Sequence, residues 1–496
     1  MRSRTFWFCF FILPCEGVTV MQRQKDRALL ALIFILLLTL PGCGTTAGKI
    51  SSGSRSPEET AVPPAVSAGE KPELRATPDP TPEPLKELEG VITGASKSIL
   101  ELRAAGGEEY TIFLTDETEH VGESLELGNS AVVSYRESEC TGQGIKALKL
   151  EINAGKHRDT IAVLLESMTL EEKIGQMFFV RCPDNAVEEA AKFQFGGYIL
   201  FDADFRGETP ESIRTKLQQY QNAVKLPLLV GVDEEGGEVV RVSDKPGFCE
   251  EPYWSPRELY AAGGLELVLS VEKDKVELLS SLGVNVNFAP VCDIAGDEDD
   301  FMYSRSLGQD AETTSEFIRQ TVLLYSEHSM GCVLKHFPGY GDNPDTHKGI
   351  ALDERELTEF ETRDFLPFSA GIQEGAECVL VSHNIVSCLD KTVPASLSEE
   401  WHSLLRGELG FTGCIITDDL SMGAIRKCCD IQAAAIQAIK AGNDLLCCTD
   451  YGIQLPAVIE AVRTGEISEE RIEESVRRIL AWKLRLGLLP EDAVLS

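Results

Sequence analysis

Residues 157–496 alternate between short apolar runs and longer segments whose apolar residues recur at helical spacing. Most of the runs are rich in Val, Ile and Leu, which suits strands buried on both faces of a parallel sheet. Eight buried strands with intervening helices favour an α/β fold of the (β/α)8 TIM-barrel type over an open doubly wound sheet. The predicted strands are 178–180, 197–200, 227–232, 284–288, 332–334, 378–381, 414–417 and 444–446.

The first and last helices of this barrel have clear sequence signals. Thr169-Leu170-Glu171-Glu172 forms a capping box, which predicts a helix running from there towards Met177. A final helix is expected at about Glu469 to Leu486.

Residues 88–153 follow a different pattern, in which apolar and polar residues alternate in short runs between glycine-rich and polar turns. This alternation is typical of strands with one buried face. About five strands are expected, and they predict a small antiparallel barrel or sandwich. Two roles are open for this module, a spacer and a binder of wall glycan. We favour the spacer, because the module has no cluster of ionisable residues suited to catalysis.

Residues 1–43 have the pattern of a bacterial lipoprotein signal. Met21–Arg27 is basic, and Ala28–Leu40 is apolar. The apolar run of about 13 residues is shorter than the roughly 20 that span a bilayer. It ends in Leu40-Pro41-Gly42-Cys43, which resembles the lipoprotein box. We expect translation to start at Met21, and Cys43 to anchor an exported protein to the outer face of the bacterial cell membrane.

Residues 44–87 are rich in Ser, Gly, Thr, Pro and Glu and finish in a proline-rich run at 77–84. A segment of this composition has too few apolar residues to form a core. It predicts a disordered tether between the anchor and the first folded module.

The chain of 496 residues has 80 acidic and 46 basic residues, for a formal net charge of −34. This charge repels nucleic acid and anionic membrane surfaces, so membrane attachment would depend on the lipid. The sequence has no glycine-rich nucleotide motif and no C-x-x-C pair among its 15 cysteines. We therefore expect no cofactor and no metal site. Several cysteines are expected to serve as small apolar residues of buried strands: Cys332, Cys378, Cys414, Cys447 and Cys448.

Polar residues collect where the predicted strands end, which is where (β/α)8 enzymes place their chemistry. One such residue alone could cap a helix or close a turn, but their shared position predicts an active site. The groups are Asp233-Glu234-Glu235, Asn287 with Asp293, Lys335-His336 with Asp345 and His347, Ser382-His383-Asn384, and Thr417-Asp418-Asp419.

Three of these residues suit the cleavage of an acetal through a covalent intermediate. Asp345 and His347 lie two residues apart in a glycine- and proline-rich loop, so the carboxylate can hold one imidazole nitrogen and leave the other for a substrate. Asp418 directly follows a buried strand, which holds it rigidly. We predict that Asp418 is the nucleophile, that His347 is the proton donor and that Asp345 orients His347.

On these motifs, residues of about 160–490 resemble the β-N-acetylhexosaminidases of glycoside hydrolase family 3. The motifs are Lys335-His336-Phe337-Pro338-Gly339-Tyr340-Gly341 with Asp345-Thr346-His347, Asp233-Glu234-Glu235-Gly236-Gly237, Asn287-Phe288-Ala289-Pro290 and Thr417-Asp418-Asp419-Leu420-Ser421-Met422.

The resemblance implies hydrolysis, with retention of configuration, of terminal non-reducing β-linked N-acetylglucosamine, which we expect to come from peptidoglycan fragments. It implies the same three catalytic roles. It also implies that the sugar is bound by Asp233, Arg241, Arg305, Lys335 and His336. The sequence departs from the family at Tyr340, where histidine is usual, and at Glu238, where arginine is usual. Both departures bear on the shape of the site rather than on the catalytic residues.

Three other functions are open. A family 3 β-glucosidase or xylosidase is one, although those enzymes typically recruit a glutamate from a further C-terminal domain. A phosphorylase is another, since a histidine acid/base does not repel phosphate as a carboxylate does. The third is a lipoprotein that binds wall glycan without cleaving it.

Overall fold

The computed structural model describes residues 84–490, except for 97, 105–107, 116, 123–124, 126–128, 142–143, 154–155 and 449. The predicted export signal, Cys43 and most of the predicted tether lie outside the described residues. The tether was predicted two residues too long, because Lys86 and Glu87 already pair with the strand at Ser130–Tyr135. Within the described ranges, no helix combines the length and apolar character needed to cross a membrane.

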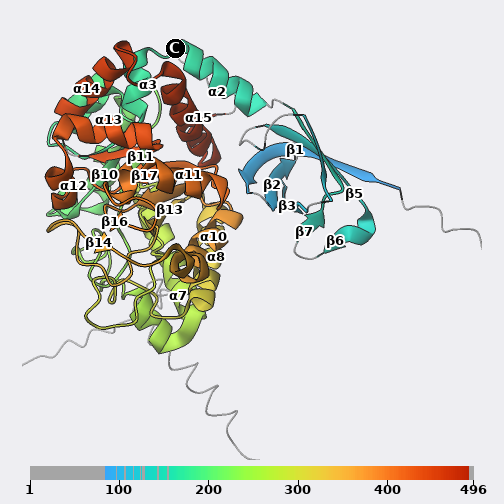
Figure 1. Ribbon diagram of the computed structural model, residues 1–496, viewed down its shortest axis with the longest axis horizontal. Coiled ribbons are helices and arrows are strands. Elements are labelled where there is room, and N and C mark those ends of the chain that lie inside the picture. Colours follow the sequence, from blue (N-terminus) through green and yellow to red (C-terminus); the bar gives the residue numbers. More distant parts are fainter. Residues whose placement is uncertain are drawn as a thin grey trace, which may run out of the picture.

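An all-β module precedes the barrel (Figure 1). Its sheet has the order β4-β8-β5-β1-β2-β3-β7-β6, and the pairs β3–β7 and β4–β8 are parallel. The sheet is therefore mixed, whereas the sequence predicted an antiparallel one. The strands are β1 (Lys86–Ala95), β2 (Ile99–Ala104), β3 (Glu109–Phe113), β4 (Glu119–Gly122), β5 (Ser130–Tyr135), β6 (Cys140–Thr141), β7 (Gly144–Lys146) and β8 (Lys149–Asn153).

The module has a small core of its own. Alternate residues of its longer strands face inward and are buried, among them Ile92, Leu102, Ile112 and Val133. The sequence pattern missed β4, β6 and β7, because these strands are short and β4 is exposed along its whole length.

The predicted (β/α)8 barrel is confirmed. Its strands are all parallel and follow one another around the sheet in chain order. A bridge between Ile416 and Leu445 joins the last strand to the seventh and closes the ring. The strands are β9 (Phe178–Arg181), β10 (Gly197–Leu200), β11 (Leu229–Val232), β12 (Val286–Asn287), β13 (Gly331–Phe337), β15 (Cys378–Val381), β17 (Cys414–Thr417) and β18 (Leu446–Cys448).

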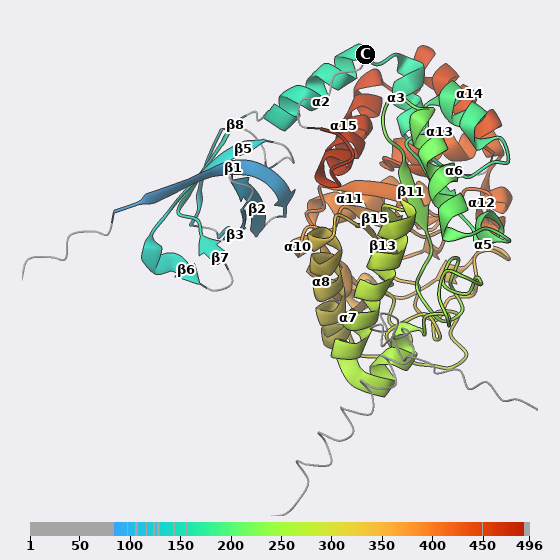
Figure 2. The ribbon, with the colours of Figure 1, turned by 180° about the vertical axis from the view of Figure 1, so that it is seen from behind.

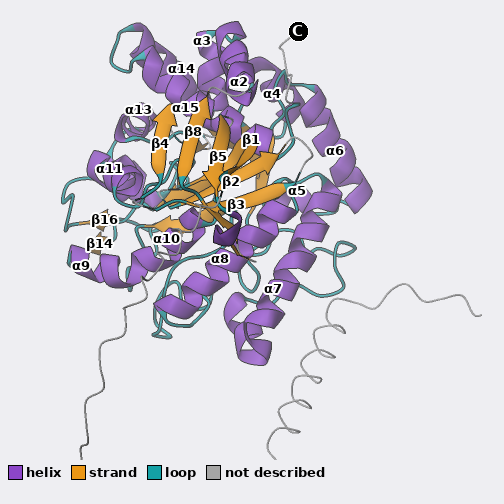
Figure 3. Cartoon of the chain, turned by 90° about the vertical axis from the view of Figure 1, so that its right-hand side faces the viewer, coloured by secondary structure: helices purple, strands orange, loops and turns teal. Residues whose placement is uncertain are grey.

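Helices surround this ring, as Figure 3 shows from the side of the β module. The first capping box is present, with Thr169 and Glu172 bonded to each other's backbone N–H groups. The helices are α2 (Lys156–Ser167), α3 (Leu170–Gln176), α4 (Ala186–Phe193), α5 (Asp202–Phe205), α6 (Pro210–Asn222), α7 (Pro256–Leu282), α8 (Ala311–Glu327), α9 (Leu357–Glu359), α10 (Phe365–Gln373), α11 (Glu399–Gly407), α12 (Gly423–Cys428), α13 (Ile431–Ala441), α14 (Tyr451–Arg463) and α15 (Glu469–Arg485). A small parallel pair, β14 (Leu352–Asp353) with β16 (Ile385–Val386), ties two of the loops together.

The module lies at the N-terminal ends of the barrel strands, next to α15 and joined to the barrel by α2 (Figure 2). Arg485 of α15 donates to Glu101 of β2 at 3.0 Å and to the carbonyl of Gly375 at 2.6 Å. Thr412 donates to the carbonyl of Ala95 at 3.2 Å. Gly375 and Thr412 lie just before β15 and β17, so the module covers the end of the barrel opposite the predicted active site.

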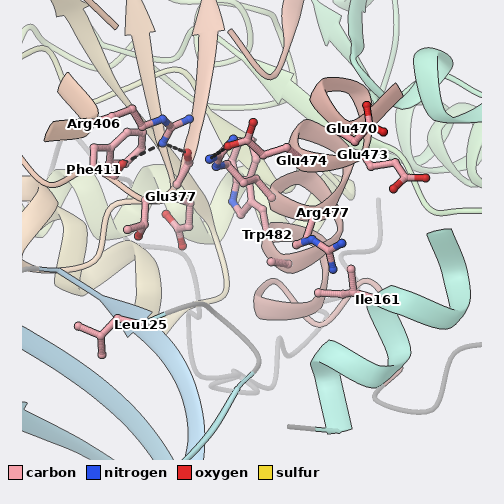
Figure 4. Close-up of a pocket in the computed structure, with 14 residues that line it drawn as sticks. Leu125, Ile161, Glu377, Arg406, Phe411, Glu470, Glu473, Glu474, Arg477 and Trp482 are labelled. Atoms are coloured by element: carbon pink, nitrogen blue, oxygen red, sulfur yellow. Dashed lines mark hydrogen bonds and ion pairs between the residues drawn. The ribbon is translucent and has the colours of Figure 1, made fainter. Parts of the chain in front are cut away.

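A cavity of about 730 Å³ opens at this same end, between the module, α2 and α15 (Figure 4). It is lined by Leu125, Ile161, Phe411 and Trp482 together with charged residues of α15. Arg406, which also lines it, is paired with buried Asp444 at 2.5 Å. None of the predicted catalytic or sugar-binding residues lines this cavity, so it is separate from the candidate active site.

Candidate active site

The C-terminal ends of the strands bring the predicted residues to one end of the barrel. Asp233 follows β11, Lys335 and His336 belong to β13, and Asp418 follows β17. The loop after β13 adds Asp345 and His347. The carboxylate of Asp418 interacts electrostatically with the imidazoles of His336, His347 and His383, so these groups share one site.

Asp418 is fixed by its own backbone and by its neighbour. Its N–H donates to the carbonyl of Val381 at 3.1 Å, which continues the pairing of β15 with β17. Its Oδ1 accepts the N–H of Asp419 at 2.8 Å. Burial raises the pKa of Asp418, but the nearby imidazoles and this hydrogen bond lower it by more, so its pKa lies below the ordinary 3.8. The group is therefore an ionised carboxylate at neutral pH, as a nucleophile must be.

Asp345 and His347 form the predicted pair. The Nδ1 of His347 lies 2.7 Å from Oδ1 of Asp345, and the same oxygen accepts the His347 N–H at 2.9 Å. Burial raises the pKa of Asp345, but its bonds to His347 lower it by more, to below the ordinary 3.8. The His347 side chain is 63% exposed. The ionised carboxylate thus holds Nδ1 and leaves Nε2 as the nitrogen that can exchange a proton with a substrate.

The loop that carries His347 lies directly on the first turn of α12, a few residues after Asp418. The carbonyl of Thr346 accepts the N–H of Ala424 at 3.2 Å, and the carbonyl of Lys348 accepts from Lys427 at 3.2 Å. A Cβ on Gly423 would lie only 2.7 Å from the His347 carbonyl oxygen. Glycine at this position is therefore what lets the loop of His347 lie against the segment that follows Asp418.

Replacing Gly423 by Ala is expected to displace the loop and to lower kcat about 10-fold to 100-fold, since small misplacement of a catalytic group has effects of this size. The fold should survive, because Gly423 has no positive φ. Gly452→Ala is the matched control, since Gly452 lies in the first turn of α14 with no atom near its added Cβ. Equal activities for the two variants would show that the contact with Gly423 does not place the loop.

A buried ion cluster forms the floor of the site. Glu235 accepts two bonds from Arg305, at 2.9 and 2.7 Å, and pairs with Lys335 at 2.5 Å. Lys335 also donates to Asp233 at 2.8 Å. Burial raises the pKa of Glu235, but the two cations lower it far below the ordinary 4.5. The cluster is held together by charge and leaves Asp233 the more open of the two carboxylates.

Glu235→Gln is expected to reduce the free energy of unfolding by about 3 kcal/mol at neutral pH, because it leaves Arg305 without its partner in a buried place. The lowered pKa means that the charge of Glu235 stabilises the fold fully above pH 4.5. This stabilisation declines as the pH falls from 4.5 towards the much lower pKa that Glu235 has in the folded state. Urea midpoints should therefore differ less at about pH 4 than at about pH 7. The exposed Glu238→Gln is the control, and an equal shift for both variants would contradict this role.

Asp293 organises the other side of the site, and the sequence assigned it no role. Its Oδ2 accepts from Nδ1 of His336 at 2.7 Å and from the His336 N–H at 3.1 Å, while its Oδ1 accepts the N–H of Tyr340 at 2.7 Å. Nε2 of His336 then accepts from Arg305 at 3.3 Å. Both ring nitrogens of His336 are thus engaged by the protein, and its contact with sugar stays a prediction.

Two further residues of the predicted site are His383, which follows β15, and Arg241, which was predicted to bind the sugar. Nδ1 of His383 lies 2.7 Å from the Ser396 hydroxyl, and its Nε2 lies 3.0 Å from the Asp419 carbonyl oxygen. His383 is therefore a buried support beneath the nucleophile strand. Arg241 makes a long contact of 3.4 Å to Asp233, and its Nε is buried without a partner in the described structure. The described residues contain no group of three or more side chains placed to hold a metal ion.

A family model described as the glycosyl hydrolase family 3 N terminal domain matches residues 169–482. The chain belongs to glycosyl hydrolase family 3. The match spans the whole barrel from α3 to α15 and leaves out the β module.

Two family relatives are similar over most of their own length. The chain is 33% identical over 268 residues to a beta-hexosaminidase of Nitrosomonas eutropha. The matched segment covers 51% of this chain and 74% of that protein. It is 30% identical over 304 residues to a beta-hexosaminidase of Methylococcus capsulatus, which covers 61% of this chain and 88% of that protein.

Solved family 3 structures share the fold. A glycoside hydrolase family 3 beta-N-acetylglucosaminidase from Paenibacillus sp. matches with a TM-score of 0.62 and 30% identity, over 66% of this chain and 64% of that chain. A family 3 member from Mycobacterium smegmatis matches with a TM-score of 0.59 and 29% identity, over 64% of this chain and 98% of that chain. The family resemblance of the sequence is thus confirmed.

Proposed function

We propose that the protein is an exo-acting, retaining β-N-acetylhexosaminidase that removes terminal β-linked N-acetylglucosamine from glycans. The observation that carries this proposal is the pairing of His347 with Asp345 on a loop docked beside the ionised Asp418. The named activity of the family relatives, beta-hexosaminidase, supports the same substrate class.

In the first step, a carboxylate oxygen of Asp418 attacks the anomeric carbon while the bond from that carbon to the leaving oxygen breaks. Nε2 of His347 gives its proton to the leaving oxygen, and Asp345 stabilises the charge of the imidazole through Nδ1. In the second step, Nε2 takes a proton from water, the water oxygen attacks the anomeric carbon, and Asp418 leaves as a carboxylate. Two inversions at the same carbon give overall retention.

The terminal sugar would lie over the floor of the site. Asp233 and Arg241 are half-buried and border the ion cluster, so they are suited to hydroxyl groups of the sugar. Lys335 and Arg305 are bound to Glu235, and their role is to hold Asp233 and His336 in place as well as to offer remaining donors. We propose that these five residues, Asp233, Arg241, Arg305, Lys335 and His336, form the non-reducing-end subsite.

We further propose that the enzyme is a lipoprotein attached through Cys43 and acts on peptidoglycan fragments outside the cell. The lipoprotein box in the sequence supports the anchor, and an exported location supports a wall-derived substrate. With the anchor at its N-terminus, the β module would act as a spacer, because it lies at the end of the barrel opposite the catalytic residues.

The test compares chromogenic β-N-acetylglucosaminide with the matching β-glucoside, using the purified full chain in detergent. Preferential cleavage of the acetamido sugar is expected. Preference for the glucoside would indicate a family 3 β-glucosidase instead. Faster turnover on adding phosphate, with a sugar phosphate as product, would indicate a phosphorylase. Binding without turnover of either substrate would indicate a glycan-binding lipoprotein.

A further inference from the structure

Tyr340 connects His336 and Asp293 with the loop that carries His347. Its ring is buried, with only 2% of the residue exposed, and packs against Phe301 at a centroid distance of 5.4 Å and against His336 at 5.7 Å. Its backbone N–H donates to Asp293, which also holds His336. The ring of Tyr340 is therefore fixed by Phe301 and His336, and its backbone is fixed by Asp293.

The hydroxyl of Tyr340 reaches the acid/base loop. It accepts the N–H of Thr346 at 3.0 Å, and it lies 2.7 Å from the Thr346 hydroxyl. Thr346 is fully buried and stands between the two members of the acid/base pair, Asp345 and His347. The phenol oxygen of Tyr340 thus holds Thr346, and the placement of Asp345 and His347 depends on Thr346.

Thr346 is held from the opposite side as well. Its carbonyl accepts the N–H of Ala424, at the start of the helix that follows Asp418. The loop before it is closed on Tyr340, because Asn343 donates to the Tyr340 carbonyl through its side chain at 2.8 Å. Thr346 is therefore clamped between Tyr340 and the segment that carries the nucleophile.

We propose that Tyr340 is a positioning residue whose hydroxyl sets the placement of His347 relative to Asp418. The inference rests on the proposed function, because it assigns Tyr340 a role in proton transfer to the leaving group. Tyr340 stands where the family usually has histidine, so the family resemblance does not imply a phenol oxygen at this place. A purely structural Tyr340 would support the core without affecting leaving-group protonation.

Tyr340→Phe separates the two roles, because it removes the hydroxyl and keeps the ring. The measurement is kcat/KM of the full chain for two substrates. One is a dinitrophenyl β-N-acetylglucosaminide, whose leaving group departs as an anion. The other is chitobiose, whose leaving sugar hydroxyl needs a proton. We expect kcat/KM for chitobiose to fall about 10-fold to 100-fold, and that for the dinitrophenyl substrate to change by less than about 3-fold.

Two further variants serve as a control and as an independent test of the same contact. Tyr198→Phe is the matched control, since Tyr198 is also buried and loses one hydroxyl bond, to the Ala186 carbonyl at 2.8 Å, in a remote part of the barrel. It should change neither substrate's rate. Thr346→Val removes the hydroxyl partner of Tyr340 and should lower the chitobiose rate selectively. Combined with Tyr340→Phe, it should add little, because both variants break the same contact.

Equal losses for both substrates in Tyr340→Phe, or no loss for either, would overturn the inference. If Tyr340→Phe fails to fold, Thr346→Val decides by the same ratio of rates. If the wild-type chain cleaves both substrates and the variants lose no more activity on chitobiose than on the dinitrophenyl substrate, only the role of Tyr340 is contradicted. A wild-type chain that cleaves neither defeats the proposed function itself.

Discussion

Asp418→Asn is expected to lower kcat/KM for a β-N-acetylglucosaminide by about 10⁴-fold, because an amide cannot form the glycosyl ester through which the reaction passes. The nearby imidazoles lower the pKa of the wild-type carboxylate, so it is ionised throughout the neutral range and the loss should be undiminished there. The measurement is release of a chromogenic leaving group by both proteins at matched concentration.

Asp310→Asn is the matched control for this substitution. Asp310 caps α8 through its side chain, and asparagine caps a helix equally well. Its activity should equal that of the wild type. An Asp418→Asn protein that is folded and keeps more than about a tenth of the wild-type rate would mean that another group is the nucleophile.

His347→Ala is expected to have the second largest effect, with a loss of about 10²- to 10⁴-fold for substrates whose leaving group needs a proton. For a dinitrophenyl substrate, glycosylation of Asp418 should proceed and the second step should become slow, since no base activates the water. A burst of dinitrophenolate followed by slow turnover is therefore expected.

Azide distinguishes this explanation from a loss of substrate binding. The azide anion needs no base, so it should accelerate the second step of the variant and give a glycosyl azide of β configuration. Lys348→Ala, at the next and exposed position of the loop, should show neither burst nor azide rescue. Absence of both effects in His347→Ala would contradict its role as acid and base.

The barrel could be predicted from the sequence because most of its strands are buried on both faces and read as short apolar runs. Several bounds differ from the predicted ones, and the end of β13 differs for a physical reason that bears on the site. The predicted strand stopped at Leu334, whereas the structure continues it to Phe337. The sequence predicts Lys335 and His336 in a loop because they are polar. In the structure they are buried and bonded to partners distant in sequence, Glu235 and Asp293. Local pattern carries no information about such partners.

The candidate catalytic residues could be selected from the sequence for a different reason. Asp418, Asp345 and His347 each follow a recognisable strand. Their spacing already suggests that Asp345 and His347 form a bonded pair and that Asp418 is held at the end of a strand. What the sequence could not supply is how the loop is held. The close approach of Gly423 and the reach of the Tyr340 hydroxyl to Thr346 depend on the packing of β13 and α12 in three dimensions. The roles of the individual residues stay predictions until the variants are measured.

The most direct test of the covalent mechanism is intact-mass analysis of the full chain mixed with an activated, fluorinated N-acetylglucosaminide, which slows the second step. We expect one sugar adduct per chain, mapped by peptide analysis to Asp418, and no adduct on the Asp418→Asn protein. An adduct on a different carboxylate, or turnover with inverted configuration and no adduct, would contradict a glycosyl-Asp418 intermediate.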